Sequence, residues 1–200
     1  MDGIDWAASA MAAARSRLEI STTNLANASS DGFRKIVAHG LLNASGARIV
    51  SEQSSAHGGL RRTGRDFDIA IVGDGAFRIK DPGGAVSTTR NGAFTRSVDG
   101  SLRNDAGAAL IGLRGPVHMP DGATIDNAGR VMLAGKQIDR IIVGAGASVR
   151  TGFLESANVN AVEEMVNVLA AQRSFESAEK VVSAIDQTRQ KASNEIARLK

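Results

Sequence analysis

Two acidic side chains near the middle of the sequence, Asp66 and Asp68, are spaced as paired carboxylates. Separated by one residue in an extended segment, they would lie on the same face of a strand. Two carboxyl groups can divide the acid and base roles in the hydrolysis of a sugar bond. No aromatic residues that could form a sugar pocket accompany them, so a solvated strand face is the favoured interpretation, and a hydrolase is the alternative.

The other candidate patterns for catalysis, cofactors or metals are incomplete. The chain has no Cys, and its three His residues (His39, His57 and His118) are far apart and lack Cys or Glu neighbours at ligand spacing. The run Gly144-Ala145-Gly146 lacks the third glycine of a dinucleotide fingerprint, because position 149 is Val149. We therefore predict no catalytic residue, no metal site and no cofactor, and we do not expect an enzyme.

The overall composition excludes several classes of protein. Of the 200 residues, 42% are hydrophobic and 22% charged, which argues against a disordered chain. No apolar run approaches the roughly 18 residues of a membrane-spanning helix, so no membrane insertion is expected. The net charge of +3 is spread along the chain, so nucleic acid is not the expected partner. A secretory signal begins with positively charged residues, whereas Asp2 and Asp5 stand at these positions here, so a secretory signal is not expected.

Glycine and proline divide the sequence into helical ends and a turn-rich middle. Of the 22 Gly residues, 21 lie between Gly32 and Gly152, together with all three Pro residues. Because both residue types interrupt helices, we predict an α+β fold, with a central all-β domain of hairpins and long terminal helices that form a coiled-coil-like axial domain. The expected segments are an N-terminal helix and signature (1–35), an extended connector (36–64), a β domain (65–150) and a C-terminal helix (151–200).

Both terminal segments carry an apolar seam with 3-4 spacing, the pattern of a helix that packs on another helix. The first helix is predicted to end near Asn27, and the second to begin near Asn158 or Asn160, either of which suits a helix N-cap. The N-terminal seam is Ile4, Ala7, Met11, Ala14, Leu18, Ser21 and Leu25. The C-terminal seam is Val168, Ala171, Phe175, Ala178, Val182, Ile185, Arg189, Ala192, Ile196 and Leu199, with Val162, Met165, Val166 and Leu169 as a second apolar flank.

The middle of the chain is predicted to form short strands. Phe67, Ile69 and Ile71 alternate with Asp66, Asp68 and Ala70, and Phe77 and Ile79 resume this half-buried pattern after a glycine turn.

The C-terminal seam is too long for the body of the protein. A helix of roughly 40 residues is about 60 Å long, whereas a domain of about 90 residues is only some 30 Å across. The two seams must therefore pair with each other or with helices of other chains, because isolated helices are marginally stable in water.

Four motifs in the sequence resemble those of the bacterial flagellar rod and hook proteins, in the same order. They are Asn24-Leu25-Ala26-Asn27 with Asp31-Gly32-Phe33-Arg34-Lys35; Asp68-Ile69-Ala70-Ile71-Val72-Gly73-Asp74-Gly75-Ala76-Phe77; Thr89-Arg90-Asn91-Gly92-Ala93-Phe94; and Gly152-Phe153-Leu154-Glu155-Ser156-Ala157-Asn158-Val159-Asn160 with Glu164-Met165-Val166 and Gln172-Arg173-Ser174-Phe175-Glu176. Ser30 stands where that family usually has Thr.

The resemblance implies an axial subunit of the flagellar basal body without a catalytic site, most like a proximal or distal rod protein. Its partners would be itself, other rod and hook subunits, and the flagellar type III export apparatus. Its place would be the rod, in the periplasm or cell envelope, where it would transmit torque from motor to hook. The alternative is a soluble β-domain binding module whose terminal helices form an intramolecular hairpin.

The seams and motifs together provide the residues expected to contact other subunits. They are Ile4, Met11, Leu18, Asn24, Leu25, Asn27, Gly32, Phe33, Asn158, Val159, Asn160, Met165, Val168, Gln172, Arg173, Phe175, Val182 and Ile185.

Overall fold

The structure, a computed structural model, describes residues 3–43 and 46–198. The fold is α+β, and the chain forms two compact units, each assembled from segments that are distant in sequence. Unit 1 contains the described residues of 1–28, 35–55 and 159–200, and unit 2 contains residues 29–34 and 56–158.

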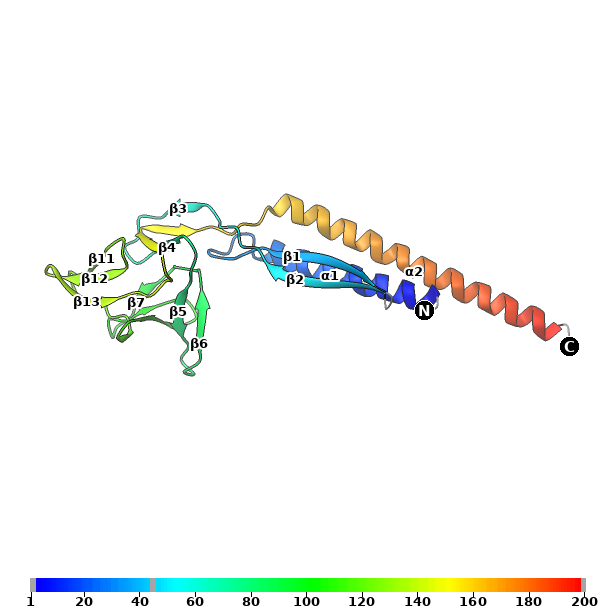
Figure 1. The fold of residues 1–200 in the computed structure, drawn as a ribbon, viewed down its shortest axis with the longest axis horizontal. Coiled ribbons are helices and arrows are strands. Elements are labelled where there is room, and N and C mark those ends of the chain that lie inside the picture. Colours follow the sequence, from blue (N-terminus) through cyan, green and yellow to red (C-terminus); the bar gives the residue numbers. More distant parts are fainter. Residues whose placement is uncertain (1–2, 44–45, 199–200) are drawn as a thin grey trace. The chain divides into compact units, whose positions relative to one another are not determined.

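The two helices of unit 1, α1 (Gly3–Ala26) and α2 (Ala161–Arg198), pack against each other in antiparallel orientation (Figure 1). A Cβ atom placed on Gly3 would lie 3.4 Å from Ile185 Cδ1, while Asn24 near the other end of α1 interacts with Glu164. Ala7, Ala14 and Ser21 of the predicted N-terminal seam are buried. The sequence prediction of both helices is confirmed, and their seams form the contact as far as Ile185.

A β-hairpin packs on α1 in the same unit. Strands β1 (Ile36–Asn43) and β2 (Gly46–Gln53) are antiparallel, with Ile36 opposite Gln53, and the hairpin lies along the helix (Figure 1). The sequence predicts an extended connector over 36–64, but residues 36–43 and 46–53 are paired strands. The backbone N–H of Ala47 donates to Ser9 Oγ at 3.2 Å, so the pairing is stabilised by a distant helix and leaves a weak local signal.

Unit 2 contains the remaining, shorter strands in four antiparallel groups. A six-stranded sheet has the order β6-β5-β9-β8-β7 with β10 paired to β9, and three further groups are β11-β12-β13, β14-β4 and β15-β3. The bounds are β3 (Leu60–Arg62), β4 (Ile69–Val72), β5 (Phe77–Lys80), β6 (Val86–Thr89), β7 (Thr95–Arg96), β8 (Leu102–Arg103), β9 (Ala109–Gly112), β10 (Gly115–Pro116), β11 (Thr124–Ile125), β12 (Arg130–Leu133), β13 (Lys136–Arg140), β14 (Ser148–Thr151) and β15 (Phe153–Glu155).

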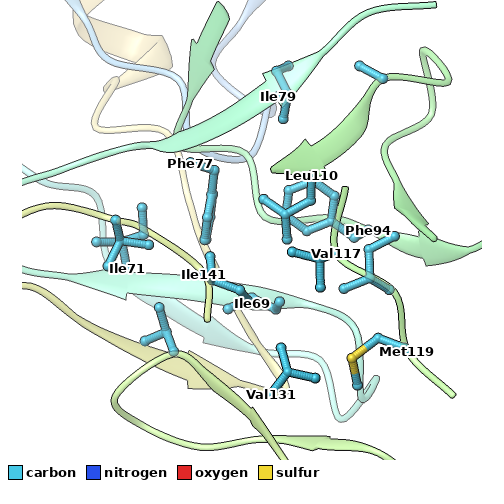
Figure 2. Packing of buried hydrophobic residues seen from close by; sticks show 14 residues of the cluster. Ile69, Ile71, Phe77, Ile79, Phe94, Leu110, Val117, Met119, Val131 and Ile141 are labelled. Atoms are coloured by element: carbon cyan, nitrogen blue, oxygen red, sulfur yellow. The ribbon is translucent and has the colours of Figure 1, made fainter. Parts of the chain in front are cut away.

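The core of unit 2 lies between these strands (Figure 2). Phe77 and Phe94 meet edge to face, with ring centroids 5.4 Å apart, a favourable arrangement for two aromatic rings. In β5, Phe77 and Ile79 point inward and Arg78 and Lys80 outward, as their alternation predicts.

The half-buried strand predicted over residues 66–72 is only partly correct. Strand β4 begins at Ile69, and Ile69, Ala70 and Ile71 are all buried, so both of its faces are covered. Asp66 and Phe67 lie in a turn.

Candidate functional site

Arg90 occupies the centre of a buried junction in unit 2. Its Nε donates to Glu155 Oε2 at 2.6 Å, and both side chains are almost fully buried. Its Nη1 donates to the carbonyls of Gly75 and Gly73 at 2.6 and 3.2 Å, and Nη2 donates to that of Ile71 at 3.3 Å. Removing one member of a buried ion pair is costly, because the other charge is left uncompensated. The guanidinium therefore links β15 to the turn that follows β4.

The second oxygen of the Glu155 carboxylate faces residues just before β3. Glu155 Oε1 accepts from the backbone N–H of Gly58 at 3.2 Å and lies 3.8 Å from His57 Nδ1. The same His57 nitrogen lies 3.2 Å from Arg34 Nη2, and His57 Nε2 lies 3.1 Å from Asp74 Oδ1. His57 is thus an exposed residue that contacts charged side chains on both ring nitrogens.

Gly32 packs directly on the backbone beside Arg90. Its N–H donates to the carbonyl of Glu155 at 2.6 Å, and its φ of 72° lies in the left-handed region. A Cβ atom here would approach Asn91 N to 2.3 Å, so only glycine fits. The preceding Asp31 accepts from Arg61 Nη2 at 2.9 and 3.0 Å. Parts of all four motifs therefore meet around the Arg90–Glu155 pair, while Asn24, Lys35 and Glu164, from the first and fourth motifs, lie in unit 1.

In unit 1, the side-chain amide of Asn24 forms two hydrogen bonds with the backbone of Ile36, as a neighbouring strand would. Asn24 Nδ2 donates to the Ile36 carbonyl, and the Ile36 N–H donates to Asn24 Oδ1, both at 2.8 Å. Asn24 is 1% exposed, so both bonds are shielded from water. This amide fixes the start of β1 against the end of α1.

Lys35 joins the same region to the first turn of α2. Its Nζ lies 2.8 Å from Glu164 Oε1 and 3.2 Å from Glu163 Oε1. The hydrogen bond to Glu164 raises the pKa of Lys35 above its ordinary value. Burial pushes the pKa of Glu164 upward, but the hydrogen bond and charge of Lys35, with the amides of Asn167 and Asn24, outweigh it, and the pKa is lowered. Both groups are therefore charged at neutral pH.

Asn160 caps the N-terminus of α2, as the sequence predicts. Its Oδ1 accepts from the backbone N–H groups of Val162 and Glu163 at 3.1 and 3.3 Å. In unit 2, Asn158 Nδ2 donates to the Ala56 carbonyl at 2.8 Å.

One face of α2 presents large apolar side chains to solvent. Val162, Met165, Val166 and Leu169, here called the apolar flank, are 70%, 52%, 60% and 55% exposed. They follow the i, i+3, i+4, i+7 spacing of a single helix face. Helix α2 also continues past the start of α1, from residue 186 to residue 198, over about 20 Å at 1.5 Å per residue (Figure 1). Residues 186–192 of this extension are exposed.

The predicted contact residues fall into three environments. The seam members are half-buried between the two helices: Ile4, Met11, Leu18, Leu25, Val168, Phe175, Val182 and Ile185. In the motifs, Asn24 is buried, and Asn27, Gly32, Phe33, Asn158 and Val159 are half-buried. Asn160, Met165, Gln172 and Arg173 are exposed. Within one copy, only the last group is open to a partner without rearrangement.

The candidate catalytic pair is not a pair in space. Asp66 is exposed in a turn, whereas Asp68 is 1% exposed with Arg65 Nε at 3.5 Å from its Oδ1, so the expected solvated strand face is wrong for Asp68. Over residues 3–43 and 46–198, His, Asp and Glu side chains nowhere gather in threes as a metal site would require. In the parts of α1 and α2 that the structure describes, neither helix has a stretch that is long and apolar enough to cross a membrane.

Sequence reasoning missed the charged residues that build these contacts. Arg90, Glu155 and Glu164 stand inside the motifs. The available signal was a charged residue at a motif position. A single sequence does not reveal which charges pair across 65 positions.

Three family profiles match the chain. Residues 4–34 match "Flagella basal body rod protein", residues 70–133 "Flagellar hook protein FlgE/F/G D1 domain" and residues 150–195 "Flagellar basal body rod FlgEFG protein C-terminal". Gly32, Arg90 and Glu155 thus each lie in a different matched segment.

Curated relatives match over most of their length. The flagellar basal-body rod protein FlgF of Mesorhizobium japonicum is 33% identical, with 88% of this chain and 90% of the relative covered. FlgF of Rhizobium meliloti is 31% identical, with 88% and 89% covered. The basal-body rod protein FlgG of Buchnera aphidicola is 26% identical, with 88% and 92% covered.

The matches define a class of structural, non-enzymatic proteins of the bacterial flagellum. The chain belongs to the flagellar basal-body rod protein family, and its place is the flagellar basal body.

Proposed function

We propose that this protein is a rod subunit that self-assembles through its terminal helices and transmits torque from the motor to the hook. Its partners are further copies of itself and other rod or hook subunits. The observation that carries the proposal is α2, which presents the apolar flank and continues beyond Ile185 into a segment whose residues 186–192 are exposed. Apolar side chains at such exposure are stabilised when a neighbour covers them.

Intramolecular packing accounts for only part of the helical surface. Within one chain, the N-terminal seam, which starts at Ile4, packs on the C-terminal seam as far as Ile185. This is the contact that the hairpin alternative expects. The exposed flank and the extension favour contacts with other subunits, which in the assembled rod would be coiled-coil-like and involve the predicted contact residues of α1 and α2. Export through the flagellar type III apparatus belongs to this proposal, since the family implies it.

The proposal is tested in cells that lack this protein and receive it from a plasmid. A variant with Val162, Met165, Val166 and Leu169 all changed to Ser should be exported but missing from purified basal bodies, and the cells should lose motility. A matched control changes Lys80, Asp105, Lys136 and Gln137, four exposed polar positions of unit 2, to Ser. Normal basal-body content and motility with the flank variant would contradict assembly through α2.

Unchanged helicity separates a lost contact from a lost fold. Circular dichroism of the purified flank variant should match that of the original chain, because the changed side chains lie outside the seam.

A further inference from the structure

Unit 1 contains a groove on the side of α2 away from the apolar flank. It has a volume of about 370 Å³ and lies between α1, β1 and α2. The α2 wall consists of Glu164, Asn167 and three small side chains, Ala170, Ala171 and Ser174, and Ser21 lies on the α1 wall. Small side chains between two helices leave holes that large side chains of another helix can fill. Here we call this cavity the small-residue groove.

The groove and the apolar flank are on different sides of the same helix. At about 100° per residue, the groove-lining positions Asn167, Ala170 and Ser174 centre about 120° away from the flank. A copy therefore cannot fill its own groove with its own flank. A two-fold axis uses the same surface patch on both copies, so it would pair flank with groove only if both lay within one patch.

The charges beside the two surfaces are complementary. Arg17 lines the groove on α1 and makes no ion pair within residues 3–43 and 46–198. Glu176 lies seven residues after Leu169, on the side of the flank, and is exposed. In the antiparallel helix pair Arg17 lies near the level of Ala171. Parallel copies in near register would bring Glu176 of one within about a turn of Arg17 of the next.

We propose that the apolar flank of one copy docks into the small-residue groove of a second, parallel copy. The inference rests on the proposed function, because it names which surfaces meet when subunits assemble. The contact is heterologous, with each copy offering a flank on one side and a groove on the other. Such contacts continue from copy to copy and generate rings or open helical assemblies rather than closed dimers.

Cysteine cross-linking in basal bodies tests this contact, because the chain has no Cys of its own. Cells co-express two full-length variants, one with Met165→Cys on the flank and one with Asn167→Cys in the groove, and their purified basal bodies are oxidised. In near register these two positions differ by about 3 Å along the helix axis, within reach of a disulfide. A disulfide-linked dimer is expected from the mixture and not from either variant alone. The matched control replaces Asn167→Cys by Ser183→Cys, an exposed serine on the flank side of α2, and should give no dimer.

The outcomes separate the two proposals. A dimer that forms only between the Met165→Cys and Asn167→Cys chains supports the docking. If the chains are present in basal bodies but Met165→Cys links to itself, or no mixture links, the docking is overturned while the rod function stands. If the original chain is absent from basal bodies, the proposed function fails and the docking fails with it.

Discussion

Arg90 and Glu155, separated by 65 positions in sequence, form a buried ion pair at 2.6 Å on which the segments of unit 2 converge. The same guanidinium holds the carbonyls of Ile71, Gly73 and Gly75, and the backbone of Glu155 receives the N–H of Gly32. Motifs that are far apart in the sequence therefore have one structural role, which is to close unit 2.

Loss of the Glu155 carboxylate should destabilise unit 2 strongly. Glu155→Ala leaves the Arg90 guanidinium buried without a counter-charge, and the expected loss of unfolding free energy is about 3–5 kcal/mol. Asp121→Ala is the control, because it removes an exposed ion pair with Arg96 and should cost at most about 1 kcal/mol. Urea unfolding followed by circular dichroism measures both. Equal losses for the two variants would show that the buried pair is not essential.

Gly32 should be irreplaceable for a reason beyond its backbone angle. Gly32→Ala places a Cβ atom 2.3 Å from Asn91 N, whereas Gly122, with a similar φ of 78°, has open space around it. Gly122→Ala therefore measures the cost of the left-handed conformation alone, about 1–2 kcal/mol. The Gly32→Ala loss should exceed it clearly in thermal unfolding. Indistinguishable melting temperatures would mean that the close approach to Asn91 is easily relieved.

The stability of unit 1 should depend on pH through Glu164 and Lys35. The folded-state pKa of Glu164 is lowered, so its stabilising effect is present above the ordinary value of 4.5 and is lost as the pH falls through the lowered pKa. The pKa of Lys35 is raised, so its contribution is present below 10.5 and is lost as the pH rises through the raised pKa.

Glu164→Gln tests the acid side of this dependence. The variant should be less stable by about 1–3 kcal/mol at neutral pH, and the difference from the original chain should shrink below pH 4.5 as the carboxylate is protonated. Fluorescence of Trp6, the single tryptophan, reports unfolding of α1. Glu163→Gln, whose carboxylate is more exposed, is the control and should change less. A difference that stays constant from pH 7 to pH 3 would exclude the Lys35–Glu164 pair as its source.

The sequence predicts what depends on local periodicity. The seams of α1 and α2 follow from 3-4 spacing, Asn160 follows from cap chemistry, and β5 from alternation. The hairpin of β1 and β2 is not predicted, because its stabilising partners, Asn24 and Ser9, lie on α1. Nor is the burial of Asp68, since the strand starts one residue later and both of its faces are covered.

The candidate contact surfaces divide in the same way. The sequence locates the second apolar flank of α2 but does not show that it is exposed in one copy, because this depends on which side of α2 α1 covers. The groove lined by Ala170, Ala171 and Ser174 forms only where α1, β1 and α2 meet, so no local sequence pattern predicts it.

The central claim is that neighbouring subunits cover the part of α2 that one copy leaves exposed. Peptide-resolved hydrogen exchange of residues 186–198, measured in the free chain and in purified basal bodies, tests it most directly. We predict fast amide exchange in the free chain, because residues 186–192 of this extension are exposed and isolated helices are marginally stable in water, and strong protection in the basal body. Equal exchange rates in the two states would contradict the account.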